Sequence, residues 1–553
     1  MGVGIELFVI ALLASAIELA LAVSPPTVHL NNSLFIGQTV VFAGIPVQQF
    51  VGIPFAESPV GKLRFQKPVP IKSYPAEFMA TTFPKACLQY SIYPYPWYIA
   101  ARDRKSEDCL YMNIWVPTGA SPSNKKAVMY WMYGGGHRYG SMADSLYDGT
   151  KLAALGDIIV VTVNYRLNYF GFLTSNTPDA PGNLGIWDCL EGLKWVNRNI
   201  AAFGGDVSRI TIAGESAGAI NVGLLSISPL AKGLYARQIM ESASPAYRRA
   251  DNNTQNIMFS QQLAETVGCT SDTVTIYNRP KEVVDCLRRI DADTIMKLDF
   301  YLGPNVGSRL VPQFGDELLP NNPREEIIKN NFRCTDLLIG NNKDEGSYSL
   351  TAYQYKDYFG FYGEKNPHVN RSFGESILRG AVSEFPDPEA IVNYYLPPYL
   401  QKDTNHSIRT LVYTAMGDTV LLCPTVYYVE QCAEQEREVY FYFFTHRPSV
   451  TKWAPWLGVT HFEEVQFVFG RPVFNSTYDV QESVLSKQMI EIWSSFVKYG
   501  KPSISWPSYN KESRRFKILG PDIVTGTTGF NGPHKANCEF LKPHFGFSKN
   551  FLQ

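Results

Sequence analysis

Short apolar runs alternate with segments of helical periodicity along most of the chain. The runs are rich in β-branched and aromatic residues and lead into turns or helical spacing, which is typical of buried parallel strands. The clearest runs lie at 127–133, 158–163, 209–213, 336–339 and 439–444. Apolar residues recur at helical spacing over 184–202 and 484–499. This pattern predicts an α/β protein with a large, mostly parallel central sheet flanked by helices.

The chain of 553 residues is long enough for three or four domains by length alone. However, it contains no internal repeat, low-complexity tract or long linker. We therefore expect residues 23–553 to form a single catalytic domain.

The N-terminal segment has the features of a secretory signal. Residues 5–22 are mostly apolar and end in Ala20-Leu21-Ala22, whose small residues suit cleavage before Val23. A membrane anchor is the alternative, because no Lys or Arg precedes the run and its length is close to that of a membrane span. Cleavage would remove residues 1–22. No second apolar stretch of that length follows, so no membrane anchor is expected after cleavage.

Charge and composition exclude several partners. The chain has 50 Lys plus Arg and 51 Asp plus Glu, a net charge of −1. That balance gives no basic footprint for nucleic acid or an anionic membrane. No CxxC or Cys/His cluster is present, and we expect no metal or other cofactor. Five sequons for N-glycosylation agree with secretion: Asn31, Asn252, Asn370, Asn405 and Asn475.

The nine cysteines are an odd number, so at least one is free or pairs with another chain, as in a homodimer. Short spacings, 87/109 and 269/286, are compatible with closed loops, and 423/538 with a tie from the C-terminal segment to the body. Sequence spacing does not determine the connectivity.

The strongest chemical signal is the run RITIAGESAGA at 209–219. A strand, a sharp turn and a helix in this order form a nucleophile elbow, which predicts Ser216 as the nucleophile. Gly214 and Gly218 lie two residues before and after the serine, where side chains would clash across such a turn. Ser216 would then lie at the N-terminus of a helix, which favours its alkoxide-like state.

A second glycine cluster supplies candidate donors for an oxyanion hole. Gly134, Gly135 and Gly136 directly follow a predicted strand. Bare backbone N–H groups there can approach a reacting carbonyl, together with the N–H of Ala217.

The acid and the histidine are expected after the serine in chain order. Asp344 and Glu345 follow the predicted strand at 336–339, and only one of them can face an imidazole. Among the histidines after Ser216, position favours His461 and leaves His446 open.

Six motifs in the same order resemble the type-B carboxylesterase/cholinesterase family. They are SEDCLYMNIWVP (106–117), YGGGHRYG (133–140), APGNLGIWDCLEGLKWVNRNIAAFGGD (180–206), TIAGESAG (211–218), GNNKDEGS (340–347) and WLGVTHFEEVQFVFG (456–470). The resemblance spans nearly the whole mature chain. It implies an α/β-hydrolase fold. It also implies that the protein hydrolyses small-molecule carboxylic esters through an acyl-enzyme.

The resemblance also assigns roles to residues. It implies the catalytic triad Ser216, Glu345 and His461, and the oxyanion donors Gly135, Gly136 and Ala217. It implies the disulfides Cys87–Cys109, Cys269–Cys286 and Cys423–Cys538, which leave Cys189, Cys334 and Cys432 unpaired.

The substrate-binding positions depart from those of cholinesterases. By resemblance, Glu215, Tyr348 and Trp97 would hold a quaternary ammonium, but the match at Trp97 is poor. Val306 and Ser308 stand where acetylcholinesterases carry two phenylalanines, which implies a roomier acyl pocket.

Three further departures lie close to the expected chemistry. They are Arg249 in place of a pocket aromatic, His137 in place of a phenylalanine and Phe462 in place of a glycine. We therefore expect a secreted carboxylesterase of broad specificity. A choline esterase is the first alternative, and a non-enzymatic adhesion or binding protein with this fold is the second.

Overall fold

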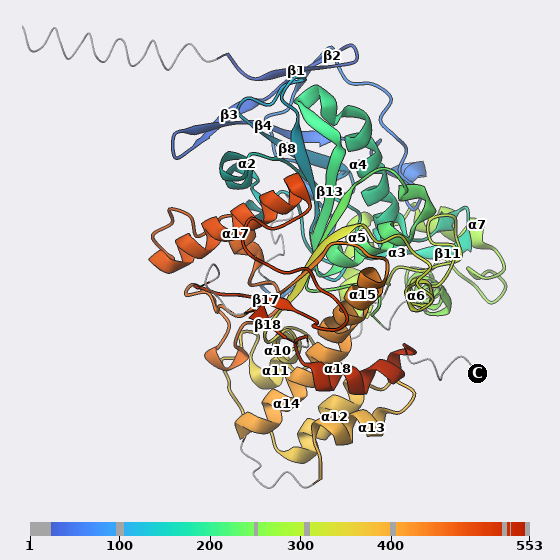
Figure 1. Ribbon diagram of the computed structural model, residues 1–553. Coiled ribbons are helices and arrows are strands. Elements are labelled where there is room, and N and C mark those ends of the chain that lie inside the picture. The colour runs from blue at the N-terminus through green and yellow to red at the C-terminus, as the bar shows by residue number, and fades with distance from the viewer. Residues whose placement is uncertain are drawn as a thin grey trace, which may run out of the picture.

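A computed structural model describes residues 24–95, 104–247, 253–302, 310–398, 405–522, 528–530 and 532–547. Its centre is a twisted sheet of eleven strands (Figure 1), in the order β18-β17-β16-β15-β14-β13-β9-β10-β8-β4-β3. Neighbours from β10 through β9 to β17 are parallel, and the strands at both margins are antiparallel. The α/β prediction is confirmed, and the arrangement is that of an α/β-hydrolase fold.

The strands have the following bounds: β3 Gln38–Phe42, β4 Ile45–Pro54, β8 Tyr111–Pro117, β9 Lys126–Met132, β10 Ile159–Val163, β13 Gly205–Glu215, β14 Arg237–Glu241, β15 Asp336–Asn342, β16 Val439–Phe444, β17 Phe516–Leu519 and β18 Thr528–Gly529. All five strands predicted from apolar runs are present. Every residue of β10 is buried, because helices cover both faces of the parallel region and β-branched side chains pack well there.

Helices cover both faces of the sheet (Figure 1). On one side lie α2 Thr150–Gly156 and α17 Val480–Tyr499, and on the other α4 Leu184–Asn199, α5 Ala217–Ile227 and α15 Cys423–Glu434. Helix α17 begins four residues before the predicted start, because Asp479 and Glu482 form a capping box there. It ends at Gly500, whose φ is +76°.

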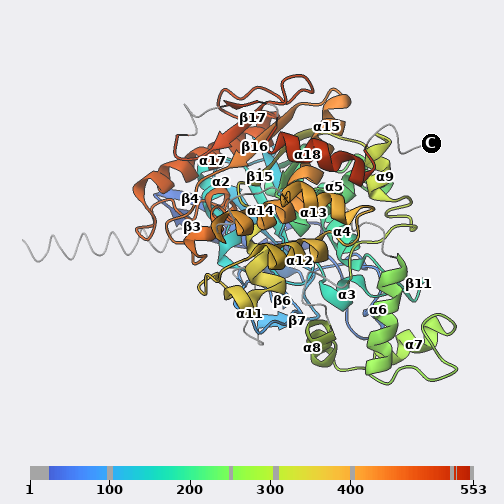
Figure 2. The same ribbon diagram turned by 90° about the horizontal axis from the view of Figure 1, so that it is seen from below.

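A group of helices follows the carboxyl end of β15 and lies at one end of the molecule (Figures 1 and 2). It comprises α10 Ser347–Ser349, α11 Lys356–Phe359, α12 Arg371–Ala381, α13 Pro388–Tyr395 and α14 Asn405–Gly417. The parallel strands therefore point their carboxyl ends toward this helical layer, where ligands of open α/β sheets bind.

The structure has four disulfides, one more than the sequence led us to expect. Cys87–Cys109, Cys269–Cys286 and Cys423–Cys538 are paired. The expectation that Cys334 and Cys432 are unpaired was wrong, since they form a disulfide with Cα atoms 5.4 Å apart. Residue 334 precedes β15 and residue 432 lies near the end of α15, and these two elements pack together. Only Cys189, which is buried, is free among the nine cysteines, all of which are described.

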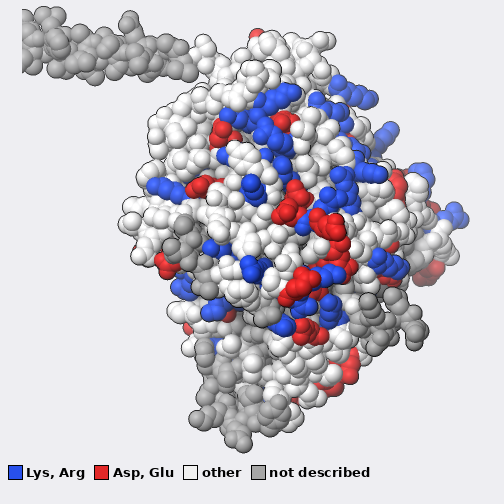
Figure 3. All heavy atoms as spheres, viewed as in Figure 1, with Lys and Arg blue, Asp and Glu red and all other residues white. Residues whose placement is uncertain are grey.

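On the face shown in Figure 3, acidic and basic side chains are interspersed. Asn31 and Asn370 are exposed, Asn475 is partly buried, Asn405 begins α14, and Asn252 lies outside the described residues. Within the described ranges no helix is long and apolar enough to span a membrane. The same ranges contain no group of three His, Cys, Asp or Glu side chains arranged to hold a metal ion.

Candidate active site

Ser216 lies on a strained turn between β13 and α5. Its backbone has φ 54° and ψ −121°, a conformation that a non-glycine residue adopts only under constraint. A Cβ atom added to Gly214 would lie 2.6 Å from the carbonyl carbon of Gly218, and one added to Gly218 would lie 2.0 Å from Met132 O. The Ser216 N–H donates to Glu241 O on β14 at 2.8 Å. Glycines and the neighbouring strand together hold the hydroxyl at the carboxyl edge of the sheet.

Glu345 and His461 form a buried pair beside this turn. Glu345 Oε2 is 2.6 Å from His461 Nδ1, while Oε1 accepts from the backbone N–H of Asn342 at 2.9 Å and from Asn341 Nδ2 at 3.2 Å. Because an ionised carboxylate only accepts hydrogen bonds, Nδ1 carries the proton and Nε2 carries the lone pair. The imidazole is thus oriented to act as a base through Nε2.

Asp344 and His446 have other roles. Asp344 Oδ2 accepts from the Val459 N–H at 2.9 Å, and the Asp344 N–H donates to Val459 O at 2.9 Å. Asp344 therefore holds the loop that carries His461 in position. His446 Nε2 is 2.8 Å from Glu482 Oε1, at the start of α17.

One small cavity brings most of the predicted site residues together. Its lining consists of Gly135, Gly136, Glu215, Ser216, Tyr348, His461 and Phe462. The Tyr348 ring stacks on the His461 imidazole, with centroids 4.8 Å apart. Trp97, Val306, Ser308 and Arg249 lie outside the described residues.

Phe462 takes an unusual backbone conformation in this lining. Its φ is +79°, in the left-handed region that favours glycine, the residue usual here in the resembling family. The phenylalanine is held there although the conformation is strained, and it lines the cavity together with Ser216.

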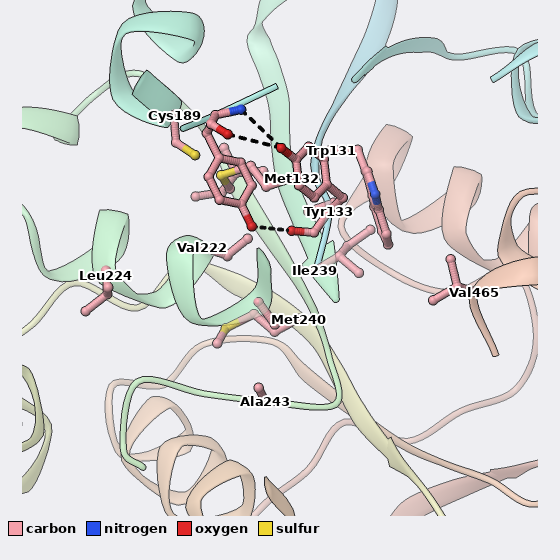
Figure 4. Close-up of a cluster of buried hydrophobic side chains, with 14 of the residues drawn as sticks. Trp131, Met132, Tyr133, Cys189, Val222, Leu224, Ile239, Met240, Ala243 and Val465 are labelled. Carbon is pink, nitrogen blue, oxygen red and sulfur yellow. Dashed lines mark hydrogen bonds between the residues drawn. The ribbon is translucent and has the colours of Figure 1, made fainter. Parts of the chain in front are cut away.

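The glycine loop after β9 is shaped for close approach. Gly135 has φ +105° and Gly136 has φ +64°. A Cβ on Gly134 would lie 2.3 Å from Glu215 Oε2, so the loop passes directly over the residue before Ser216. Below the loop, Tyr133 and Tyr165 stack at 4.5 Å and each hydroxyl donates to the other's carbonyl (Figure 4), at 3.1 and 2.8 Å. These two hydrogen bonds fix Tyr133, the residue that directly precedes the glycine loop.

The site is surrounded by buried carboxyl groups. Glu215 Oε1 lies 3.1 Å from His461 Nε2, and neither carboxyl oxygen of Glu215 has a hydrogen-bond partner in the described part of the chain. Burial, followed by the charges of Glu464, Glu345 and Glu241, raises the pKa of Glu215 well above its usual value. Burial therefore favours the protonated form of Glu215.

Sequence reasoning missed two of these carboxyl groups, Glu241 and Glu464. Trp493 Nε1 donates to Glu241 Oε1 at 2.8 Å, and Ser242 Oγ donates to Glu464 Oε1 at 2.9 Å. Burial and their mutual charge raise the pKa of Glu241, and burial and Glu345 raise that of Glu464. The run HFEEVQF contains Glu464, but its burial depends on strands remote in sequence, so no local signal identified it.

A serine on a strand-to-helix elbow, which lines one cavity with a histidine from beyond a later strand, places the protein among the α/β-hydrolases. Residues 24–535 match the model of the Carboxylesterase family. The chain belongs to this family and is a carboxylic ester hydrolase.

The sequences of several known proteins align with this chain over most of their length. Acetylcholinesterase-1 of Trittame loki is 36% identical over 526 residues, covering 92% of this chain and 91% of the relative. Cholinesterase of Mus musculus is 33% identical over 534 residues, covering 92% and 85%. Acetylcholinesterase of Leptinotarsa decemlineata is 32% identical over 560 residues, covering 93% and 85%.

Proposed function

We propose that Ser216, His461 and Glu345 form a catalytic triad that hydrolyses carboxylic esters through an acyl-enzyme. The observation that carries the proposal is the His461 imidazole, which is bonded to Glu345 at 2.6 Å through Nδ1 and lines one cavity with Ser216. The family supplies the reaction class, and the geometry supports these three residues as the groups that perform it.

Each residue has a defined part in the reaction. His461 Nε2 takes the proton of Ser216 Oγ as the oxygen attacks the ester carbonyl, and returns it to the departing alcohol. It then takes a proton from the water that attacks the acyl carbonyl, and returns it to Ser216 Oγ as the bond between that oxygen and the acyl carbon breaks and the acid leaves. Glu345 stays ionised and stabilises the imidazolium.

The N–H groups of Gly135, Gly136 and Ala217 would bind the oxyanion of each tetrahedral intermediate. Such a donor typically contributes about 3 kcal/mol to the transition state. Gly135 and Gly136 line the cavity with Ser216, and Ala217 begins the helix that follows it. This placement supports the three N–H groups as the donors of an oxyanion hole.

The substrates we propose are small esters of uncharged alcohols, with broad acyl specificity. Burial raises the pKa of Glu215 well above its usual value, which weakens its attraction for a cation. Tyr348 stacks on His461. The small Val306 and Ser308 support a roomy acyl pocket by sequence alone.

Choline esters are the second candidate, since the relatives reported above are cholinesterases by name. Glu215 and Tyr348 both line the cavity and would face such a substrate.

We also propose that the protein is secreted after removal of residues 1–22, with residues 23–553 as one catalytic domain. Four disulfides support an extracellular location, because such bonds persist in oxidising compartments.

The test compares p-nitrophenyl butyrate with acetylthiocholine, using the full glycosylated chain and Ser216→Ala. We expect a higher kcat/KM for the butyrate and loss of activity by at least about 10⁴-fold in the variant. A preference for acetylthiocholine would select the second candidate. Activity retained in Ser216→Ala would overturn the triad.

A further inference from the structure

His137, which directly follows the glycine loop, turns its side chain into the protein core. It is 3% exposed, and its ring packs against Phe172 with centroids 4.9 Å apart. Its φ is +59°. This left-handed conformation costs a histidine energy and persists only where the surrounding structure holds it. The position belongs to the motif YGGGHRYG, where the resemblance led us to expect an aromatic ring.

The imidazole binds the helix that begins after Ser216. His137 Nε2 lies 2.8 Å from Asn221 Oδ1, and the ring also hydrogen-bonds the backbone of Ala217. Ala217 and Asn221 are four residues apart on α5, so they lie on one face of its first turn. His137 therefore joins the glycine loop to the first turn of α5.

The proton on this contact is assigned by its partner. Asn221 Oδ1 can only accept, so His137 Nε2 donates. The Asn221 amide nitrogen is directed to Cys189 Sγ at 3.8 Å, which agrees with this orientation. Burial lowers the pKa of His137 to about 4, and the imidazole is neutral at the pH where esterases are assayed.

We propose that His137 is a positioning residue that sets the distance between the oxyanion donors of the glycine loop and the donor on α5. This inference rests on the proposed function. Gly135 and Gly136 follow β9, whereas Ala217 follows β13, so their N–H groups belong to separate elements. Donors must lie about 2.7–3.1 Å from the oxyanion to stabilise it, so their positions tolerate an error of only a few tenths of an ångström. A misplacement of about 1 Å can cost about 100-fold in rate.

Three variants test the inference: His137→Phe, Asn221→Leu and the double variant. Phenylalanine keeps the ring against Phe172 but cannot donate. We expect kcat for p-nitrophenyl butyrate to fall about tenfold with KM within about twofold. The kcat of the double variant should be no lower than that of the more impaired single variant, because both changes remove the same contact.

The affinity for a trifluoromethyl ketone is the second readout, because Ser216 converts this inhibitor to a hemiketal whose oxyanion occupies the same hole. We expect its affinity to fall in proportion to kcat/KM in His137→Phe. His137→Gln retains an N–H donor and should recover part of both losses. His446→Gln is the matched control, a histidine bonded to Glu482 and away from the cavity, and should change neither.

An unchanged kcat and ketone affinity in folded His137→Phe, with only a lower Tm, would overturn the inference and leave the ring a packing role. Should His137→Phe not fold, Asn221→Leu and His137→Gln give the same two readouts. A wild-type protein inactive on every ester would instead contradict the proposed function, which is a separate result.

Discussion

Two histidine–carboxylate pairs in this protein have the same geometry and different surroundings. His461 Nδ1 is 2.6 Å from Glu345, and His534 Nδ1 is 2.6 Å from Asp418. Both carboxylates are almost completely buried. The bond between an imidazole and an acid therefore does not by itself make a catalytic site.

The remaining contacts distinguish the two pairs. His461 lines the cavity of Ser216, and its Nε2 lies 3.1 Å from Oε1 of Glu215, the residue before the serine. Asp418 also accepts from Tyr395 at 2.8 Å and Asn537 at 2.7 Å. His534 is the N-cap of helix α18 Lys535–Leu541, which the Cys423–Cys538 disulfide also ties to the body. The second pair thus fastens the C-terminal helix, whereas the first lies at the cavity that Ser216 also lines.

The largest expected effect separates the two histidines. His461→Gln should lower kcat by at least about 10⁴-fold, because it removes the base that takes the Ser216 proton. His534→Gln should keep kcat within about twofold and lower the Tm. Ester turnover and thermal unfolding measured on both variants check this. Equal losses of kcat would show that the two pairs do not differ as described.

The carboxylates provide the next contrast. Glu345→Gln should lower kcat by about 10³- to 10⁴-fold, because the amide no longer fixes the imidazole tautomer. Asp418→Asn should leave kcat nearly unchanged and destabilise the fold by about 1–3 kcal/mol, because the buried carboxylate that is bonded to His534, Tyr395 and Asn537 loses part of these hydrogen bonds. Denaturant unfolding and kcat on the same preparations give both numbers. A stable, fully active Glu345→Gln would remove Glu345 from the triad.

The smallest effect is a pH dependence of stability at the second pair. Burial lowers the pKa of His534, but Asp418 and then Asp344 outweigh it and raise the pKa above its usual value. Its stabilisation is therefore complete below about pH 6.5, the usual unfolded value, and is lost as pH rises through the folded pKa. The contribution is about 1 kcal/mol or less, because the side chain is 28% exposed and solvent screens the pair.

Wild-type Tm should therefore fall more between pH 6 and 9 than that of His534→Gln. Parallel curves for the two proteins would contradict the assignment of this ion pair.

Several features were predictable because their causes are local. The elbow at Ser216 follows from a β-branched run, two glycines and a helical segment that are contiguous in sequence. The five strands followed from apolar runs, since burial on both faces requires them. Glu345 and His461 were identified only by resemblance. Position in the chain left Asp344 and His446 open, because either could reach the carboxyl edge of the sheet.

Other features depend on contacts between distant segments. Cys334 and Cys432 are 98 residues apart, and they meet only because α15 packs against β15. The pKa of Glu463 is raised to about 7 by burial, which no sequence neighbour reveals. His137 illustrates the same limit, since its departure from the motif suggested a change in the cavity, whereas its side chain enters the core.

The sequence by itself determined the type of fold, the nucleophile elbow and the glycine loop, because these depend on backbone conformations that neighbouring residues dictate. Only the tertiary structure decided which acid meets which imidazole, which cysteines pair and which carboxyl groups lose their water. Those outcomes depend on distances between strands and helices that the chain brings together after hundreds of residues, and on the burial that results.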